Sequence, residues 1–101
     1  MTIATTVADQ GEQLVITISG RFDFSAHQEF REAYESIEPA PGRYCVDMRE
    51  ASYIDSSALG MLLLLRDYAG GDNADVQIVN CNPDVRKILS ISNFEQLFTI
   101  H

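Results

Sequence analysis

Strand-like and helix-like segments alternate along the chain, and this alternation limits the possible folds more than any other feature. Residues 2–7 and 14–19 flank the turn-forming run Asp9-Gln10-Gly11-Glu12, which predicts a β-hairpin. Three further strands are expected, each after a helical segment, at residues 44–48, 76–79 and 97–100. The order ββαβαβαβ predicts one α/β domain over residues 1–101, with a mixed, mostly parallel sheet, an N-terminal hairpin and helices packed on it through right-handed crossovers.

The first and third helical segments have recognisable starts and apolar faces. Ser25, with Gln28 three residues later, forms the pattern of a capping box for a helix that runs to about Ile37. Asn82 is expected to cap the third helix, with Pro83 in the first turn, where a missing N–H costs nothing. The expected inward faces are Phe30, Ala33, Tyr34 and Ile37 in the first helix and Val85, Ile88, Leu89 and Ile91 in the third.

The composition is sufficient for one hydrophobic core, because 46% of the 101 residues are hydrophobic. A domain of this composition is expected to fold without a metal ion or a disulfide. The two cysteines, Cys45 and Cys81, belong to no CxxC pair and have no histidine nearby in the sequence. We therefore expect two small buried side chains rather than a zinc site or a redox pair.

The charge balance argues against polyanionic partners. Fifteen Asp and Glu against seven Lys and Arg give a formal charge of −8, which opposes binding to nucleic acids and to anionic membranes. The longest apolar run, Ala58 to Leu65, has eight residues, far below the ~20 that span a bilayer. The N-terminal residues lack the pattern of a secretory signal. We expect a cytoplasmic protein with no nucleic-acid partner and no membrane insertion.

The sequence offers few groups for catalysis. A serine nucleophile needs a general base within hydrogen-bond reach, and the only histidines are His27 and His101. Neither a GxSxG elbow nor a GxxxxGK phosphate loop is present, so we expect no enzyme and no cofactor. A small serine hydrolase is the enzymatic alternative, and it would have to combine Ser56 or Ser57 with Asp55 or Asp23.

The start of the second helical segment has the most unusual chemistry. Asp55 or Ser56 is its expected N-cap, and Gly70-Gly71 follows its end near Ala69. The first N–H groups of a helix have no partner within the helix and carry partial positive charge, so an anion on Ser56 would be well accommodated. A phosphoryl group adds about −1.5 to −2 charges, and a helix N-terminus tolerates it without loss of structure.

Apolar residues occur all round this second helix. At about 100° per residue, its residues divide into two faces. One face carries Ala58, Met61, Leu62 and Leu65, and another carries Ser57, Gly60 and Leu64. Such a helix in a small domain is either wholly buried or presents one side to another molecule, and the sequence leaves both readings open.

The run Asp55-Ser56-Ser57-Ala58-Leu59-Gly60 resembles the DSSGLG signature of the STAS domain of bacterial anti-anti-sigma factors. Gly20-Arg21-Phe22-Asp23 is similar to the family's G-x-L-D stretch, and residues 82–89 are similar to its third helix. The resemblance spans essentially the whole chain and implies a STAS-like single domain. Two departures are that Ala58 replaces the usual glycine and that the chain ends at His101, where longer relatives continue into a C-terminal helix.

This resemblance implies a non-enzymatic phosphoprotein that acts by partner switching in transcription regulation. Ser56 would be phosphorylated by an anti-sigma factor with serine kinase activity and dephosphorylated by a PP2C-type phosphatase. The unphosphorylated form would bind the anti-sigma factor and release a sigma factor. We expect the partner to contact Asp23, Asp55, Ser57, Gly60 and Leu64. The alternative within the same fold is an adaptor that gates another output, such as a diguanylate cyclase, a biofilm pathway or a lipid transporter.

Overall fold

The computed structural model describes residues 2–101 and has five strands and three α-helices. The strands are β1 (Thr2–Ala8), β2 (Gln13–Phe22), β3 (Arg43–Ile54), β4 (Val76–Val79) and β5 (Thr99–Ile100). The helices are α1 (His27–Glu35), α2 (Ser56–Tyr68) and α3 (Pro83–Ile91). Short 3-10 turns lie at Asp9–Gly11, Phe24–Ala26, Gly71–Asn73 and Phe94–Gln96.

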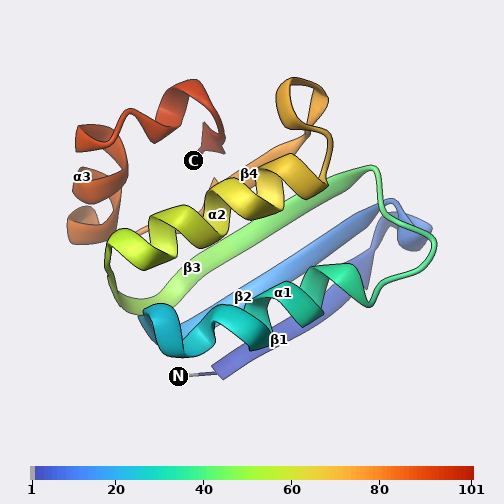
Figure 1. The fold of residues 1–101 in the computed structure, drawn as a ribbon, viewed down its shortest axis with the longest axis horizontal. Helices are drawn as coiled ribbons and strands as arrows, with labels where there is room; N and C mark the ends of the chain where they lie inside the picture. Colours follow the sequence, from blue (N-terminus) through green and yellow to red (C-terminus); the bar gives the residue numbers. More distant parts are fainter. Residues whose placement is uncertain (1) are drawn as a thin grey trace.

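The strands form one mixed sheet in the order β1-β2-β3-β4-β5. β1 and β2 form the antiparallel hairpin, and every other neighbouring pair is parallel. The helices α1 and α2 contact each other and lie over one face of the sheet, as Figure 1 shows, while α3 packs against β3. The predicted fold class and element order are confirmed.

The core lies between the sheet and the helices, and strand alternation explains which residues enter it. In β2 the residues Leu14, Ile16 and Ile18 are completely buried, whereas Val15 and Thr17 point to the opposite face of the sheet. Burying these side chains supplies the main favourable free energy of folding. The other largest fully buried side chains come from all layers of the domain: Phe22, Phe30, Met48, Ile54, Leu62, Leu65, Ile78, Leu89 and Val46.

The predicted start of the first helix is wrong in detail. Ser25 does not cap α1: a 3-10 turn, Phe24–Ala26, precedes this helix, and Asp23 caps that turn by accepting a hydrogen bond from the Ser25 N–H at 3.0 Å. The N-cap position of α1 itself is Ala26, which makes no side-chain cap bond. The capping box with Gln28 does not form, because the Gln28 amide bonds to Glu32 at 3.1 Å instead. A carboxylate two residues upstream is a stronger acceptor than the serine hydroxyl, which itself donates to Asp23.

Several element boundaries also differ from the expectation; β2, for example, continues to Phe22 rather than ending at Ser19. The helix α1 ends at Glu35 rather than near Ile37, and β3 continues from the predicted strand as far as Ile54. The last strand is only Thr99–Ile100, because the preceding residues form a 3-10 turn. Ile91 was expected to face inward but is 72% exposed, since it is the last residue of α3 and lies off the line of Val85 and Leu89.

The cysteines behave mainly as the sequence predicts. Both are free; Cys45 is buried, and Cys81 is half-buried at the margin of the core. Burial raises the pKa of both thiols, because a thiolate is poorly solvated there. Among residues 2–101, no helix has the length and apolar character needed to cross a membrane.

Candidate functional site

The three helices begin at the same end of the sheet, and this common end defines the candidate site. Because β2, β3 and β4 are parallel, their carboxyl ends meet at one edge, and each strand leads into the start of a helix there (Figure 1). Carboxyl ends of parallel strands are the usual place for binding sites in α/β folds. The start of α2, at Ser56, is one of these helix starts and therefore lies at this end of the sheet.

Asp55 is the N-cap of α2, which settles the choice that the sequence left between Asp55 and Ser56. Its backbone is extended, and its Oδ1 accepts a hydrogen bond from the Ala58 N–H at 3.0 Å. The same oxygen accepts the Ser57 hydroxyl at 2.6 Å. Ser56 is the first helical residue and is exposed, while Ser57 is half-buried. The hydroxyl of Ser57 is thus engaged in the cap, whereas Ser56 is accessible from solvent.

The two carboxylates of the site stay ionised because hydrogen bonds favour their charged forms. The Ser57 hydroxyl, followed by the Ala58 N–H, lowers the pKa of Asp55 below its ordinary value of 3.8. Hydrogen bonds from Ser25 lower the pKa of Asp23 in the same way. The charge of Asp55 acts in the opposite direction on the pKa of Asp23, so the two carboxylates are close enough to repel each other.

Arg21 is a basic residue that lies close to Asp23, one member of this acidic pair. Its Nε lies 3.9 Å from Asp23 Oδ2, and its guanidinium lies over the ring of Tyr53, 4.7 Å from the ring centre. Tyr53 is 42% exposed and Phe24 is 68% exposed. The carboxyl ends of β2 and β3 therefore display two aromatic rings beside the start of α2.

The exposed side of α2 forms a continuous stripe, so the helix is not wholly buried. The buried face is the one that the sequence predicts, with Ala58, Met61, Leu62 and Leu65 in the core. Ser56, Gly60 and Leu64 are exposed at successive turns of the opposite side. We call this side the α2 stripe, defined by the exposed residues Ser56, Gly60, Leu63, Leu64, Asp67 and Tyr68, whose large apolar members are 40–50% exposed.

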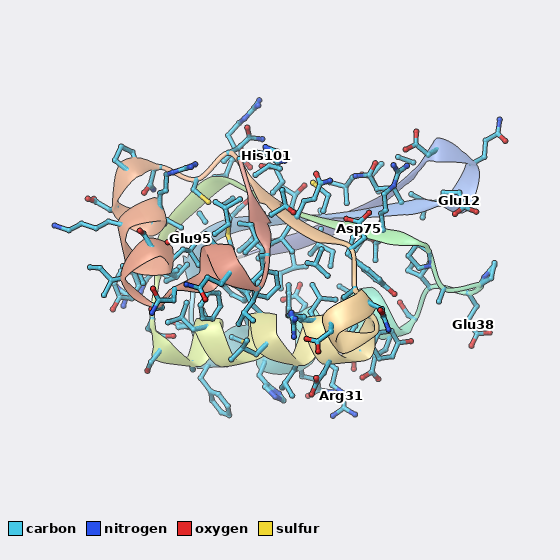
Figure 2. The ribbon with its side chains drawn as sticks, turned by 90° about the horizontal axis from the view of Figure 1, so that it is seen from above. Glu12, Arg31, Glu38, Asp75, Glu95 and His101 are labelled. Carbon is cyan, nitrogen blue, oxygen red and sulfur yellow. The ribbon has the colours of Figure 1, made fainter. Side chains whose placement is uncertain are left out.

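The α2 stripe ends in a groove between α1 and α2. A pocket of about 280 Å³ lies there, lined by Arg31, Tyr34, Glu35, Leu64 and Tyr68. The rings of Tyr34 and Tyr68 lie 5.1 Å apart across the two helices, and Arg31 bonds to Glu35 at 2.8 Å. Figure 2 shows Arg31 projecting from the helix layer on the side away from the sheet. Leu64 thus connects the stripe to a pocket with both aromatic and charged walls.

The structure brings most of the sequence-predicted site residues onto one surface. Asp23, Asp55 and Ser56 gather at the start of α2, and Gly60 and Leu64 continue from there along the helix. The sequence analysis missed Phe24, Tyr53 and Tyr68. Strand alternation could have indicated Tyr53, because it precedes the buried Ile54.

Ala58 fits the position where the related signature has glycine. It lies inside α2, its side chain is completely buried in the core cluster, and its N–H completes the cap at Asp55. A Cβ is therefore compatible with this position.

Asp55 and Ser57, which the enzymatic alternative would use, are engaged with each other in the cap of α2. The Ser57 hydroxyl contacts Asp55 directly, and a carboxylate whose pKa is lowered is a weak general base. Within residues 2–101, no cluster of three or more His, Cys, Asp or Glu side chains is placed to hold a metal ion. The geometry provides an accessible hydroxyl at a helix N-terminus, next to a helix side on which Leu63, Leu64 and Tyr68 are exposed.

Comparisons with known proteins agree with this fold. The family model described as "Mlab, STAS domain" matches residues 5–99. The STAS-domain containing protein PA14_20770 of Pseudomonas aeruginosa (strain UCBPP-PA14) is 62% identical over 100 residues, which cover 99% of each chain.

Solved structures of other proteins share the fold at low sequence identity. The unphosphorylated form of the anti-sigma factor antagonist SpoIIAA is 19% identical with a TM-score of 0.76, covering 99% of this chain and 87% of that one. The phosphorylated form of SpoIIAA, from Bacillus, is 20% identical with a TM-score of 0.70, covering 99% and 91%. A sulfate transporter family protein from Wolinella succinogenes is 16% identical with a TM-score of 0.73, covering 91% and 84%. The family match and the close relative together establish that the chain belongs to the STAS domain family.

Proposed function

We propose that this protein is an anti-sigma factor antagonist whose partner binding is controlled by phosphorylation of Ser56. The observation that carries the proposal is the position of Ser56, exposed at the N-terminus of α2 and at one end of the α2 stripe. A modification there can change what the stripe binds without disturbing the core. The fold shared with SpoIIAA supports the general role.

In the unphosphorylated state, the α2 stripe is the docking surface. Leu63, Leu64 and Tyr68 are large side chains that remain 40–50% exposed on one side of a helix. Their removal from water on binding supplies a favourable free energy, and aromatic side chains are common anchors of such interfaces. An anti-sigma factor bound to this surface would be held away from its sigma factor, which is then released.

Phosphorylation acts on this surface by charge and bulk. A phosphate on Ser56 adds about −1.5 to −2 charges beside the ionised Asp55 and Asp23. Within an interface, an unpaired buried charge costs about 2–5 kcal/mol, which weakens binding by roughly thirtyfold to several thousandfold. The N–H groups at the start of α2 favour an anion, so the fold itself is expected to stay intact.

The chemistry of the cycle belongs to the partners. An anti-sigma factor with serine kinase activity transfers the γ-phosphoryl group of ATP to the Ser56 oxygen, releasing ADP and the hydroxyl proton. A PP2C-type phosphatase then hydrolyses the phosphoester, which restores the hydroxyl and releases inorganic phosphate. This chain supplies the acceptor hydroxyl and the docking surface, and it needs no cofactor of its own. The proposed setting of the cycle is the cytoplasm.

The test uses the full chain and the anti-sigma factor kinase that labels it in the presence of ATP. Ser56→Ala should not be phosphorylated and should keep full affinity for the anti-sigma factor. For Ser56→Asp and the phosphorylated protein, this affinity should fall by about thirtyfold or more, as measured by titration calorimetry. Ser90→Asp is the matched control, because Ser90 is exposed on α3, outside the α2 stripe. Equal affinity for all four forms would refute the switch.

An adaptor that gates another output is the second candidate. The observations that favour it are the family model, described as "Mlab, STAS domain", and the fold shared with a sulfate transporter family protein. Affinity capture on Ser56→Ala protein would distinguish the two candidates. Recovery of a diguanylate cyclase or a transporter subunit, with no anti-sigma factor and no serine kinase, would support the adaptor.

A further inference from the structure

The two edges of the sheet differ in a way that the proposed function does not explain. One edge is β5, which has only two residues, Thr99–Ile100. The other edge is β1, with seven residues that pair to β2 in unbroken register from Thr2 to Ala8. Figure 1 shows β1 along the margin of the sheet, with no other described element beyond it. Its outward N–H and C=O groups are therefore available to another strand.

β1 has none of the usual protection of an exposed edge. Such strands are normally short, bulged, or carry Lys or Pro, which prevents them from pairing with another chain. β1 is the uncharged sequence TIATTVA, rich in the residue types that favour strands, and the register shifts of the sheet fall between β2 and β3 instead. Val7 on this strand is 51% exposed.

The distribution of charge allows a second copy of the chain to approach along β1. Two molecules that each carry a charge of −8 repel each other through most of their surfaces, but residues 2–8 carry no charge. Asp9, the first charged residue after β1, is neutralised by Arg43 at 2.6 Å. The strand is thus an uncharged strip along which two acidic copies can approach.

The sequence of β1 is also self-complementary about Thr5. In an antiparallel pair centred on Thr5, each residue n lies opposite residue 10 − n of the other copy. Ile3 then faces Val7 on the helix side of the sheet, and Ala4 faces Thr6 on the opposite side, so that apolar side chains pair with apolar ones and small with small. We propose that two copies associate through their β1 strands to form one continuous sheet across a two-fold axis.

This arrangement has a consequence for the site at α2. A two-fold axis perpendicular to the joined sheet leaves both helix layers on the same side of it. Both α2 stripes would then face the same direction and could bind a partner that has two equivalent binding sites. The inference rests on β1 alone and stands whether or not Ser56 is phosphorylated.

The test is sedimentation velocity of the full chain over concentrations up to the order of 100 µM, where a weak interface of this size assembles. The unmodified protein should move from monomer to dimer as its concentration rises. Thr5→Lys places like charges opposite each other, so the dissociation constant should rise at least about tenfold. Thr99→Lys is the matched control, because it makes the same change on the β5 edge, and it should dimerise normally.

Each lysine variant has a formal charge of −7, from −8 + 1, so net repulsion between copies falls in both. A loss of dimer in Thr5→Lys alone therefore assigns the effect to the β1 edge. A monomeric unmodified protein at the highest concentration, or equal behaviour of the two variants, would overturn the proposal.

Two further measurements protect the test against a misfolded variant. Val7→Thr keeps a strand-favouring side chain and removes the apolar contact with Ile3, and it should weaken the dimer by about threefold. In the unmodified protein, amide hydrogen exchange of the outward N–H groups of β1 should slow as concentration rises. Exchange in β1 that is independent of concentration would contradict the pairing.

Discussion

The starts of α2 and α3 are built on the same local plan but have different surroundings. Each follows a parallel strand, and each has a polar cap whose side chain accepts a backbone N–H three residues later: Asp55 from Ala58 at 3.0 Å, and Asn82 from Val85 at 2.8 Å. The Asn82 amide also donates to the Ala51 carbonyl of β3 at 3.1 Å. The cap of α3 is therefore tied to the sheet, while the cap of α2 is tied only to its own helix.

The residue after each cap widens this difference. Pro83 follows Asn82 and has neither an N–H nor a group that can be modified. Ser56 follows Asp55 and presents its hydroxyl to solvent. Asp55 is charged and Asn82 is neutral, so only the α2 cap responds to pH. The same capping pattern can therefore anchor a helix to the sheet, a structural joint, or leave an open site at the helix start. The outcome depends on whether the capping side chain also bonds to another element, as Asn82 does to β3.

The strongest challenge to this comparison is Asn82→Ala. This change removes the cap of α3 and leaves the Ala51 carbonyl, in a buried part of β3, without its side-chain donor. The free energy of unfolding should therefore fall by about 2–3 kcal/mol. Urea denaturation measures this change. Ser90→Ala, an exposed change on the same helix, should stay within about 0.5 kcal/mol. A loss for Asn82→Ala no larger than that of Ser90→Ala would show that α3 is not tied to the sheet.

The equivalent change at the other cap, Asp55→Ala, should cost less, about 1 kcal/mol at neutral pH, because only the cap is lost. Its Ser57 partner is half-buried and can turn its hydroxyl to water. The same urea denaturation, run beside Asn82→Ala, gives the difference between the two caps directly. Equal costs at both positions would remove the distinction between a structural joint and an open site.

Acid should separate the two caps further. The pKa of Asp55 is lowered in the folded protein, so its contribution to stability is present above the ordinary value of 3.8 and is lost as the pH falls through the folded pKa. Asp55→Asn keeps an acceptor for the Ala58 N–H and does not titrate. We expect the stability difference between the unmodified protein and Asp55→Asn to shift in favour of the variant between neutral pH and about pH 3, measured by urea denaturation. A difference that is constant with pH would contradict the assigned role of the charge.

The smallest expected effect is at Gly60, one turn along the α2 stripe. A Cβ added there meets nothing within 4 Å, and alanine favours the helix, so Gly60→Ala should stabilise the protein by about 0.5–1 kcal/mol in thermal unfolding. Gly70→Ala is the control of opposite sign, because Gly70 has a φ of +125°, which alanine adopts only with strain. If Gly60→Ala destabilised the free protein, the α2 stripe would not be open at that turn.

The local patterns predicted the elements well because alternation and helical periodicity are properties of neighbouring residues. The strand at Val76–Val79 and the cap at Asn82 have the positions that the sequence indicates. The capping box predicted at Ser25 does not form, because the chain leaves β2 through a 3-10 turn capped by Asp23 and α1 begins only after it, a detail that local periodicity does not show. Ile91 was misplaced because apolar character does not show where a helix ends relative to the core.

The sequence by itself determined the order of elements, the buried face of α2 and the run of residues 55–60 on which the site is built. Only the tertiary structure decided that the other side of α2 is open, that Asp23 lies near Asp55 at the start of this helix, and that β1 is left as a long, unprotected edge. The physical reason is that periodicity fixes which side of an element is apolar, whereas exposure and proximity depend on which other elements the chain brings against it.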